Sequence, residues 1–179
     1  GSDSITKEGY DFGGMYIDSA FTTQFNGSYD QIIANSTLVE DNKYEMNVYV
    51  KWSINEYTIS INPKAGNEIA PIAQNYGTAV TAPADPTKEG HTFGGWFEDE
   101  ACETTPYTFP VTMPARNVIV YAKWTVNQYN YTLNLDGGEF AEGATFDPTG
   151  SYNYGRPMSI PTATDEPTKE GYSFDGWEY

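Results

Sequence analysis

The chain has 179 residues, a length that allows one or two ordinary domains, and its 25 acidic and nine basic residues give a formal charge of −16. Such a charge disfavours binding to nucleic acid or to an anionic membrane surface, because both need clustered Lys and Arg. Aromatic residues make up 16% of the chain, which is far from a disordered composition, and a single cysteine excludes an internal disulfide framework. No apolar run approaches the ~20 residues that cross a bilayer.

One motif, in which Thr-Lys-Glu-Gly precedes aromatic residues and a glycine pair, occurs three times, with Asp175 in place of the first glycine of the pair in the third copy. Its copies are Thr6–Gly14, Pro86–Trp96 and Pro167–Trp177. The lysine of each copy lies 81 residues from the lysine of the next. Self-similarity at a fixed period indicates tandem modules, which are more often spacers or binders than enzymes.

A second motif recurs at a different spacing. Val48–Trp52 matches Val120–Trp124, 72 residues later. The two spacings agree if the first repeat carries an extra segment between its two motifs, and the third repeat carries one before its Thr-Lys-Glu-Gly motif. Residues 26–45 and 137–150 are these insertions, and we predict that they are variable loops in which any individual function would lie.

Alternation of apolar and polar residues predicts strands along most of the chain. Tyr57, Ile59 and Ile61, for example, alternate with small polar residues at the period of two that marks a half-buried strand. We predict strands at 46–52, 57–62, around 74–77, 91–97, 117–124 and 129–135. Helix is predicted to be sparse: 18–25 and 99–104 each allow one short turn, and 72–84 is ambiguous.

These elements divide the chain into a mainly β array of small modules. We place a partial first repeat at 3–54, a complete repeat at 55–125 and a partial third repeat at 126–179. Short linkers are expected at 53–56 and 125–128. The sheets are predicted to be short and antiparallel or mixed.

The order of these motifs resembles the Listeria–Bacteroides repeat, best known as the B repeat of internalin-type bacterial surface proteins. Asn75-Tyr76-Gly77, the Pro86–Trp96 segment and the Val120–Trp124 strand carry the resemblance. It implies a compact, β-grasp-like module, arrayed in tandem on secreted or wall-anchored proteins. Met15 departs from the pattern, because it stands where the other copies have Trp96 and Trp177.

The sequence predicts no catalytic, cofactor-binding or metal-binding residues. His91 is the only histidine, and Tyr172 takes its place in another copy, so we interpret it as a packing or surface residue. Cys102 aligns with Phe21 in the first repeat, which indicates a small buried apolar residue in place of a reactive thiol.

Two further groups of residues admit a binding role. Acidic residues gather at 98–103 and at Asp165-Glu166, where we favour a solvated acidic loop over a calcium site. The four tryptophans could stack on sugars, but their positions in repeated strands favour packing. They are Trp52, Trp96, Trp124 and Trp177.

We therefore expect a non-enzymatic module of an extracellular bacterial cell-surface or secreted protein, without cofactor, acting as a stalk or spacer. The alternative is an adhesion module that contacts host protein or glycan through Tyr-rich loops. Exposed aromatic residues within 21–45 would favour this alternative, and buried ones would favour the spacer. The partial repeats further predict head-to-tail self-association, in which one molecule completes the open sheet edge of another.

Overall fold

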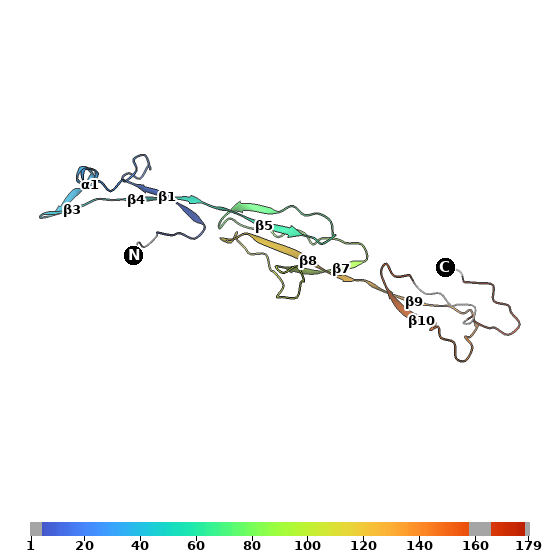
Figure 1. Cartoon of the computed structure of the whole chain (residues 1–179). Helices are drawn as coiled ribbons and strands as arrows, with labels where there is room; N and C mark the ends of the chain where they lie inside the picture. The colour runs from blue at the N-terminus through green and yellow to red at the C-terminus, as the bar shows by residue number, and fades with distance from the viewer. Residues whose placement is uncertain (1–4, 158–165, 178–179) are drawn as a thin grey trace.

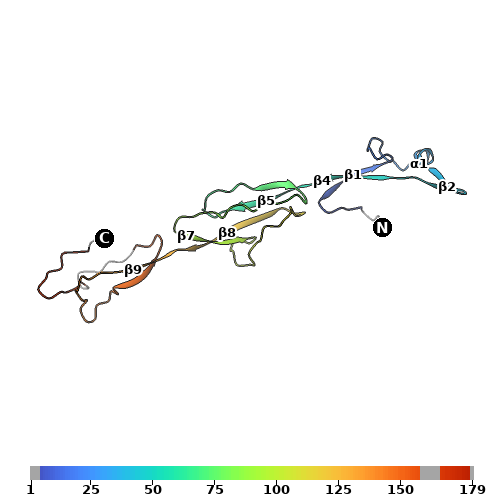
Figure 2. The same ribbon diagram turned by 180° about the vertical axis from the view of Figure 1, so that it is seen from behind.

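A computed structural model of the chain describes residues 5–157 and 166–177. The described part is mainly β, with several small sheets and a single short helix, which confirms the predicted fold class. The sheets follow one another along an extended molecule, with the first and third repeats at its opposite ends (Figure 1). The view from behind shows the same order of sheets along the molecule (Figure 2).

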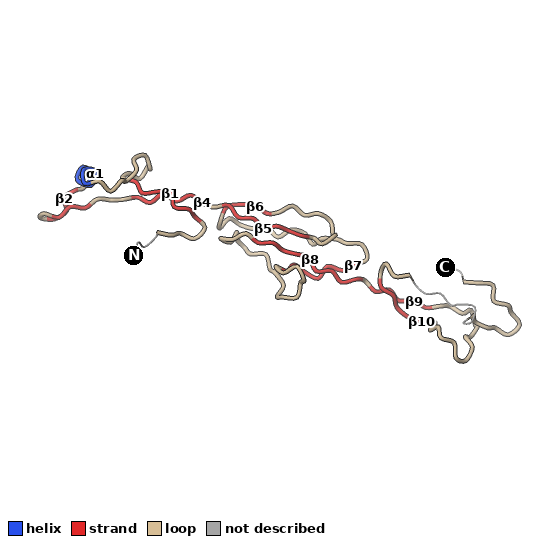
Figure 3. The backbone as a smooth tube through the Cα atoms, viewed as in Figure 1, coloured by secondary structure: helices blue, strands red, loops and turns tan. Residues whose placement is uncertain are grey.

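The middle repeat holds the largest sheet. Its strands are β5 (Glu56–Asn62), β6 (Ile72–Asn75), β7 (His91–Phe97) and β8 (Val118–Val126), in the spatial order β6-β5-β8-β7. The two central strands β5 and β8 run parallel, and each outer strand is antiparallel to its neighbour. This mixed order is β-grasp-like, with long loops in place of a crossing helix (Figure 3).

The core of the middle repeat lies on one face of this sheet. Ile59 and Val120, from the two central strands, are fully buried. Alternation places their neighbours on the opposite face, as the period of two requires. The loops cover the core with Met113, and Phe109 packs at its edge. The cluster is completed by Trp96, Val118 and Ala122.

The flanking repeats each contain one half of this sheet. In the first, β1 (Tyr10–Tyr16) pairs antiparallel with β4 (Tyr49–Ile54), as β7 pairs with β8. In the third, β9 (Gln128–Thr132) pairs antiparallel with β10 (Thr149–Asn153), as β5 pairs with β6. The strand pairing shifts register at the glycine pair, at the same place in β1 and β7, as it does at a β-bulge.

The 26–45 insertion contains the one helix of the described residues, which the sequence did not predict. It comprises α1 (Tyr29–Asn35) and a hairpin of β2 (Thr37–Glu40) and β3 (Lys43–Glu45). The Ser28 hydroxyl caps the helix by accepting a hydrogen bond from the backbone N–H of Gln31. Seven residues are too few to show a helical period in the sequence.

Other sequence predictions need correction. Segments 18–25 and 99–104 form turns without helix, because the backbone N–H groups that follow Asp18 and Asp99 bond to the carboxylates of these two residues. The strand expected around 74–77 is β6, which ends at Asn75. The expected linkers 53–56 and 125–128 lie mostly within strands, so that a single residue separates consecutive repeats.

Candidate functional site at the junctions between repeats

Each pair of consecutive repeats meets at one asparagine. Asn55 separates β4 from β5, and Asn127 separates β8 from β9. The Asn55 N–H donates to the Gly9 carbonyl at 2.9 Å, and the Asn55 carbonyl accepts from the Tyr76 N–H at 2.8 Å. Both backbone polar groups of this asparagine are therefore bonded, one to the repeat before it and one to the repeat after it.

The second junction repeats this pattern. The Asn127 N–H donates to the Gly90 carbonyl at 2.8 Å, and its carbonyl accepts from the Tyr154 N–H at 2.8 Å. A connector whose backbone groups are all bonded loses the rotational freedom that a solvated linker keeps. The chain therefore passes from one repeat to the next without a free hinge residue at either asparagine.

A tyrosine ring lies directly on a glycine at each junction. A Cβ added to Gly9 would lie 2.1 Å from the ring of Tyr76, and one added to Gly90 would lie 1.9 Å from the ring of Tyr154. Both glycines also have positive φ, +75° and +67°. The glycine of the Lys-Glu-Gly motif is thus required twice, by the turn and by the ring above it.

An aromatic residue after the glycine completes the contact. Tyr10 meets Tyr76 edge to face with ring centroids 6.1 Å apart, and His91 meets Tyr154 in the same way at 6.2 Å. Such geometry aligns the positive ring edge with the negative ring face. His91, expected to be a packing or surface residue, lies in this junction, and its Nδ1 is 2.8 Å from the Glu89 carbonyl oxygen.

The glutamate of the motif lies close enough to affect the tyrosine hydroxyl. The negative charge of Glu8 raises the pKa of Tyr76, with a smaller contribution from burial. A hydrogen bond to Glu89, followed by burial, raises the pKa of Tyr154. At each of the two junctions, the Lys-Glu-Gly turn therefore presents a carbonyl to the asparagine, and a bare backbone and a carboxylate to one tyrosine of the next repeat.

The side-chain tethers differ between the two junctions. At the first, the Asn55 amide donates to the Asp11 carboxylate at 3.0 Å. At the second, the Thr92 hydroxyl donates to the Asn127 side-chain oxygen at 2.7 Å. Both junctions have the same backbone bonds and the same ring contact. The side-chain bond differs, because the asparagine side chain donates at the first junction and accepts at the second. The shared features are therefore the ones that define the junction.

Sequence reasoning missed this site, although a signal was present. The sequence places Tyr76 in the strand predicted around 74–77, and this prediction does not connect it with the motif glycine. Asn-Tyr-Gly occurs at 75–77 and again at 153–155, and each copy follows a Lys-Glu-Gly turn of the preceding repeat. The described residues leave the same surface of the third turn uncovered, since apart from its chain neighbours none of them has an atom within 4 Å of a Cβ built on Gly171, and Tyr172 is 73% exposed.

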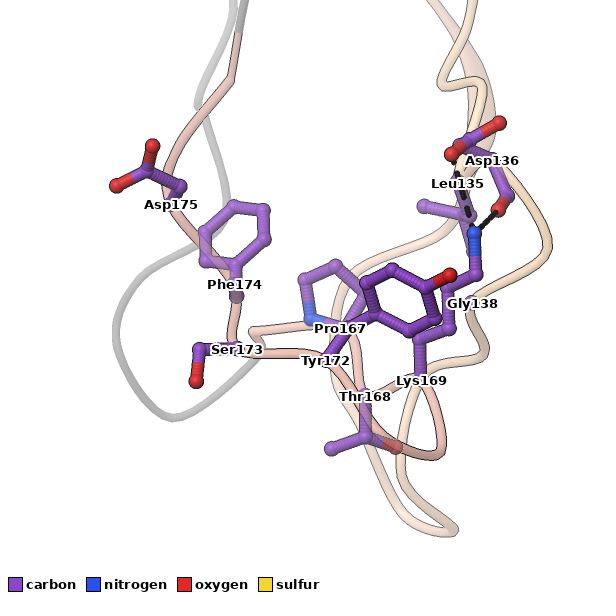
Figure 4. Close-up of a pocket in the computed structure, with 10 residues that line it drawn as sticks. All are labelled: Leu135, Asp136, Gly138, Pro167, Thr168, Lys169, Tyr172, Ser173, Phe174 and Asp175. Carbon is purple, nitrogen blue, oxygen red and sulfur yellow. Dashed lines mark hydrogen bonds and ion pairs between the residues drawn. The ribbon is translucent and has the colours of Figure 1, made fainter.

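A cavity of about 180 Å³ lies in the third repeat between the turn at 135–138 and the segment 167–175 (Figure 4). Lys169 Nζ crosses it to donate to the Asp136 carbonyl at 2.6 Å, and it also pairs with the Asp136 carboxylate at 3.1 Å. In the middle repeat, Trp124 takes the corresponding place, against Gly66 and bonded through Nε1 to the Pro63 carbonyl. The predicted head-to-tail association, in which another molecule would fill this place, stays a prediction.

Other candidate residues have structural partners. Cys102 is buried, as its alignment with Phe21 indicated, and both residues have positive φ. Glu98 forms a two-point ion pair with Arg116, and the hydrogen bonds of this pair lower the glutamate pKa. Within 5–157 and 166–177, no group of three His, Cys, Asp or Glu residues is placed to hold a metal; Asp165 lies outside these ranges.

The tryptophans divide between core and edge. Trp96 is buried in the core, and Trp124 is half-buried against Phe93 with its indole nitrogen bonded. Trp177 packs edge to face on Phe174, in the same geometry as Trp96 on Phe93. For these residues packing against neighbouring rings accounts for the aromatic side chain, as expected from their positions in the repeats.

The insertion exposes several large apolar side chains to solvent. Tyr29, Ile33, Leu38 and Tyr44 are each more than half exposed. Four of the side chains on α1 and β3 border a shallow hollow of about 390 Å³: Tyr29, Ile32, Ile33 and Tyr44. We call these four residues the insertion patch. Neighbouring apolar side chains left open to water mark an interaction surface more often than scattered ones do.

Comparisons with known proteins agree with the repeat organisation. The family model described as the Listeria-Bacteroides repeat domain matches the chain over residues 2–39, 57–123 and 129–178. A "Putative membrane protein" and a "Putative Gly-rich membrane protein" of Evansella cellulosilytica are 34% and 32% identical, over 96% and 97% of the chain. Internalin H of Listeria monocytogenes is 35% identical over 55% of the chain.

The chain spans less than a quarter of the length of each relative: 23%, 18% and 16% in the order given above. Among the described residues of the chain itself, no helix is long and apolar enough to cross a membrane.

Proposed function

Since the chain belongs to the Listeria-Bacteroides repeat family, we propose that it serves as a non-enzymatic stalk or spacer of a bacterial cell-surface protein, holding neighbouring domains at a set distance and orientation. The single observation that carries this proposal is the junction, which recurs with the same backbone bonds and the same tyrosine-on-glycine contact. The extended succession of sheets further supports it (Figure 1).

The junctions explain why an array of small repeats would keep its reach. A chain of units joined by flexible linkers coils, so its end-to-end distance grows only with about the square root of its length. Units fixed at each contact add their full length instead. The acidic surface serves the same role, because like charges on successive units repel and disfavour folding back.

The extracellular location belongs to this proposal. Its support is the family, known from bacterial surface proteins, together with the internalin and membrane-protein names of the relatives. In this location, the array would hold a neighbouring segment of the full protein away from the cell surface.

The test is to lengthen the array by one unit. A second copy of residues 55–126 is inserted after Val126, and the maximum dimension of both proteins is measured by small-angle X-ray scattering. From the parallel register of β5 and β8, the added repeat should lengthen the molecule by about 35 Å, at ~3.3 Å per strand residue. An unchanged maximum dimension, or a compact scattering profile, would contradict the spacer.

The insertion patch favours a second function, adhesion. Exposed aromatic residues within 21–45 favour an adhesion module over a simple spacer. Tyr29 and Tyr44, which lie in this range, are 76% and 65% exposed. Under this proposal the insertion of the first repeat binds host protein or glycan, while the repeats position it.

Binding of the purified chain to arrays of glycans and host surface proteins tests this second function. A variant that carries Tyr29→Ser, Ile33→Ser and Tyr44→Ser is compared with a matched variant that carries Tyr172→Ser on the third repeat, where the tyrosine is equally exposed. Saturable binding that only the first variant loses would establish adhesion through the insertion patch. Absence of binding by the unchanged chain would reject it.

A further inference from the structure

We propose that each complete repeat is a mechanical clamp, which resists tension along the array by loading the parallel β5·β8 ladder in shear. This inference rests on the proposed spacer function, since only an array held between two attachment points is pulled. It adds a property that a spacer does not need, namely resistance to unfolding under force.

The topology fixes where a pulling force enters and leaves the middle repeat. The preceding repeat connects through Asn55 directly to the first residue of β5, and the following repeat connects through Asn127 directly to the last residue of β8. The path between these points is visible in Figure 1, where β4 leads into β5 and β8 leads toward β9. No loop lies in this path to absorb extension.

The two loaded strands are neighbours and run parallel. Ile59 faces Val118 and Asn62 faces Tyr121 in this ladder. Tension draws the start of β5 backward and the end of β8 forward, so the strands are pulled in opposite directions along their own axes. All hydrogen bonds between them then share the load, whereas strands pulled apart from one end lose their bonds one at a time.

The core strengthens this arrangement. Ile59 and Val120 project from the two loaded strands into the same cluster and are fully buried. Sliding one strand past the other would move these side chains out of register and expose them to water. The antiparallel strands β6 and β7 flank the pair and lie outside the direct path of force.

The flanking repeats provide an internal contrast. Neither β4 nor β9 has a parallel partner among the described residues. Under tension, the first and third repeats should therefore open at low force, and the middle repeat should open last in a single step. Its 72 residues, from Asn55 to Val126, should release about 220 Å, given ~3.5 Å per extended residue and a folded span of ~35 Å.

Single-molecule pulling in two directions tests the clamp on one folded protein. In a Cys102→Ala background, handles are attached either at the chain ends or at Asn62→Cys and Lys123→Cys, which lie at the same end of the β5·β8 ladder and so peel it open. At equal loading rate, we expect the middle repeat to need at least about twofold more force through its ends, because the ladder bonds then share the load.

Equal or lower force through the chain ends would overturn the clamp. The outcome for the spacer is read separately from the scattering experiment. A molecule that lengthens with an added repeat but opens at the same force in both directions is a spacer without a clamp. A molecule that does not lengthen rejects the spacer, whatever its unfolding force.

Discussion

The same strand sequence has two environments in this molecule. Val120 in β8 is fully buried, whereas Val48, at the start of the matching segment in the first repeat, is 39% exposed. Both belong to the Val-Tyr-x-Lys-Trp motif. What differs is the partner, because β8 lies between β5 and β7, and β4 pairs only with β1 among the described residues. Burial, and with it stability, is therefore set by the assembled sheet and not by the motif.

The largest expected effect comes from comparing these two valines. Val120→Ala removes two buried methyl groups and leaves a cavity, so we expect a loss of about 2–3 kcal/mol in the free energy of unfolding. Val48→Ala, the matched control, should cost less than about 1 kcal/mol because its side chain is partly in water. Denaturant unfolding followed by tryptophan fluorescence measures both, and equal costs would refute the contrast.

The three motif glycines give the next comparison. Gly9, Gly90 and Gly171 all have positive φ, so Ala at any of them costs about 1–2 kcal/mol of backbone strain. Among the described residues, a tyrosine ring lies on Gly9 and on Gly90 but none lies on Gly171. Gly9→Ala and Gly90→Ala should therefore also shift the ring resonances of Tyr76 and Tyr154 in NMR spectra.

Gly171→Ala serves as the control for that experiment. It should carry the backbone cost alone and leave both tyrosine rings in place. If all three variants left the resonances of Tyr76 and Tyr154 unchanged, the tyrosine-on-glycine contact would not be a feature of the protein in solution.

A smaller effect is expected from the ion pair of Glu98 with Arg116. The hydrogen bonds with the guanidinium lower the pKa of Glu98 below its ordinary value, so the pair stabilises the fold at pH values above that ordinary value. This contribution is lost as the pH falls through the lowered pKa. Because both side chains are about half exposed, Arg116→Ala should cost at most about 0.5 kcal/mol at neutral pH.

The difference in stability between Arg116→Ala and the unchanged chain, measured from neutral pH to acid, checks this sign. It should shrink as the pH falls. A difference that grows toward acid would mean that the carboxylate is not held in its charged form by the arginine.

The smallest effect concerns the tyrosine hydroxyls at the junctions. Glu8 raises the pKa of Tyr76, and Glu89 raises that of Tyr154. Glu8→Gln should therefore lower the Tyr76 pKa and leave the Tyr154 pKa unchanged, with Glu89→Gln showing the reverse. Titration of ¹³C-labelled tyrosine by NMR separates the two. A matching shift at both tyrosines would show that net charge, and not the local contact, governs them.

Much of the fold could be predicted because the strands alternate clearly. Tyr57, Ile59 and Ile61 mark β5 in the sequence, and the Phe-Gly-Gly-Trp segment at 93–96 marks β7, where the strand pairing shifts register. Cys102 could be placed in the interior by its alignment with Phe21. These features depend on local periodicity and on internal repetition, which a sequence displays directly.

The candidate site could not be predicted in the same way, since it depends on contacts across repeats. Nothing local to Gly9 indicates that Tyr76, 67 residues later, lies on it. The sequence does not show helix α1 because Tyr29–Asn35 makes fewer than two full turns and buries no residue. Asn55 falls within the linker expected at 53–56 between two repeats, yet its backbone is fully bonded between two strands.

If the junctions hold consecutive repeats in a fixed orientation, the distance between two points on either side of a junction is also fixed, and this distance can be measured directly. Spin labels at Ile119→Cys in β8 and Ser151→Cys in β10, with Cys102→Ala to remove the native thiol, report the separation of the second and third repeats by pulsed electron paramagnetic resonance. We predict one narrow distance distribution, which broadens when Gly90→Ala is added. A broad distribution in the protein that retains Gly90 would contradict a fixed junction.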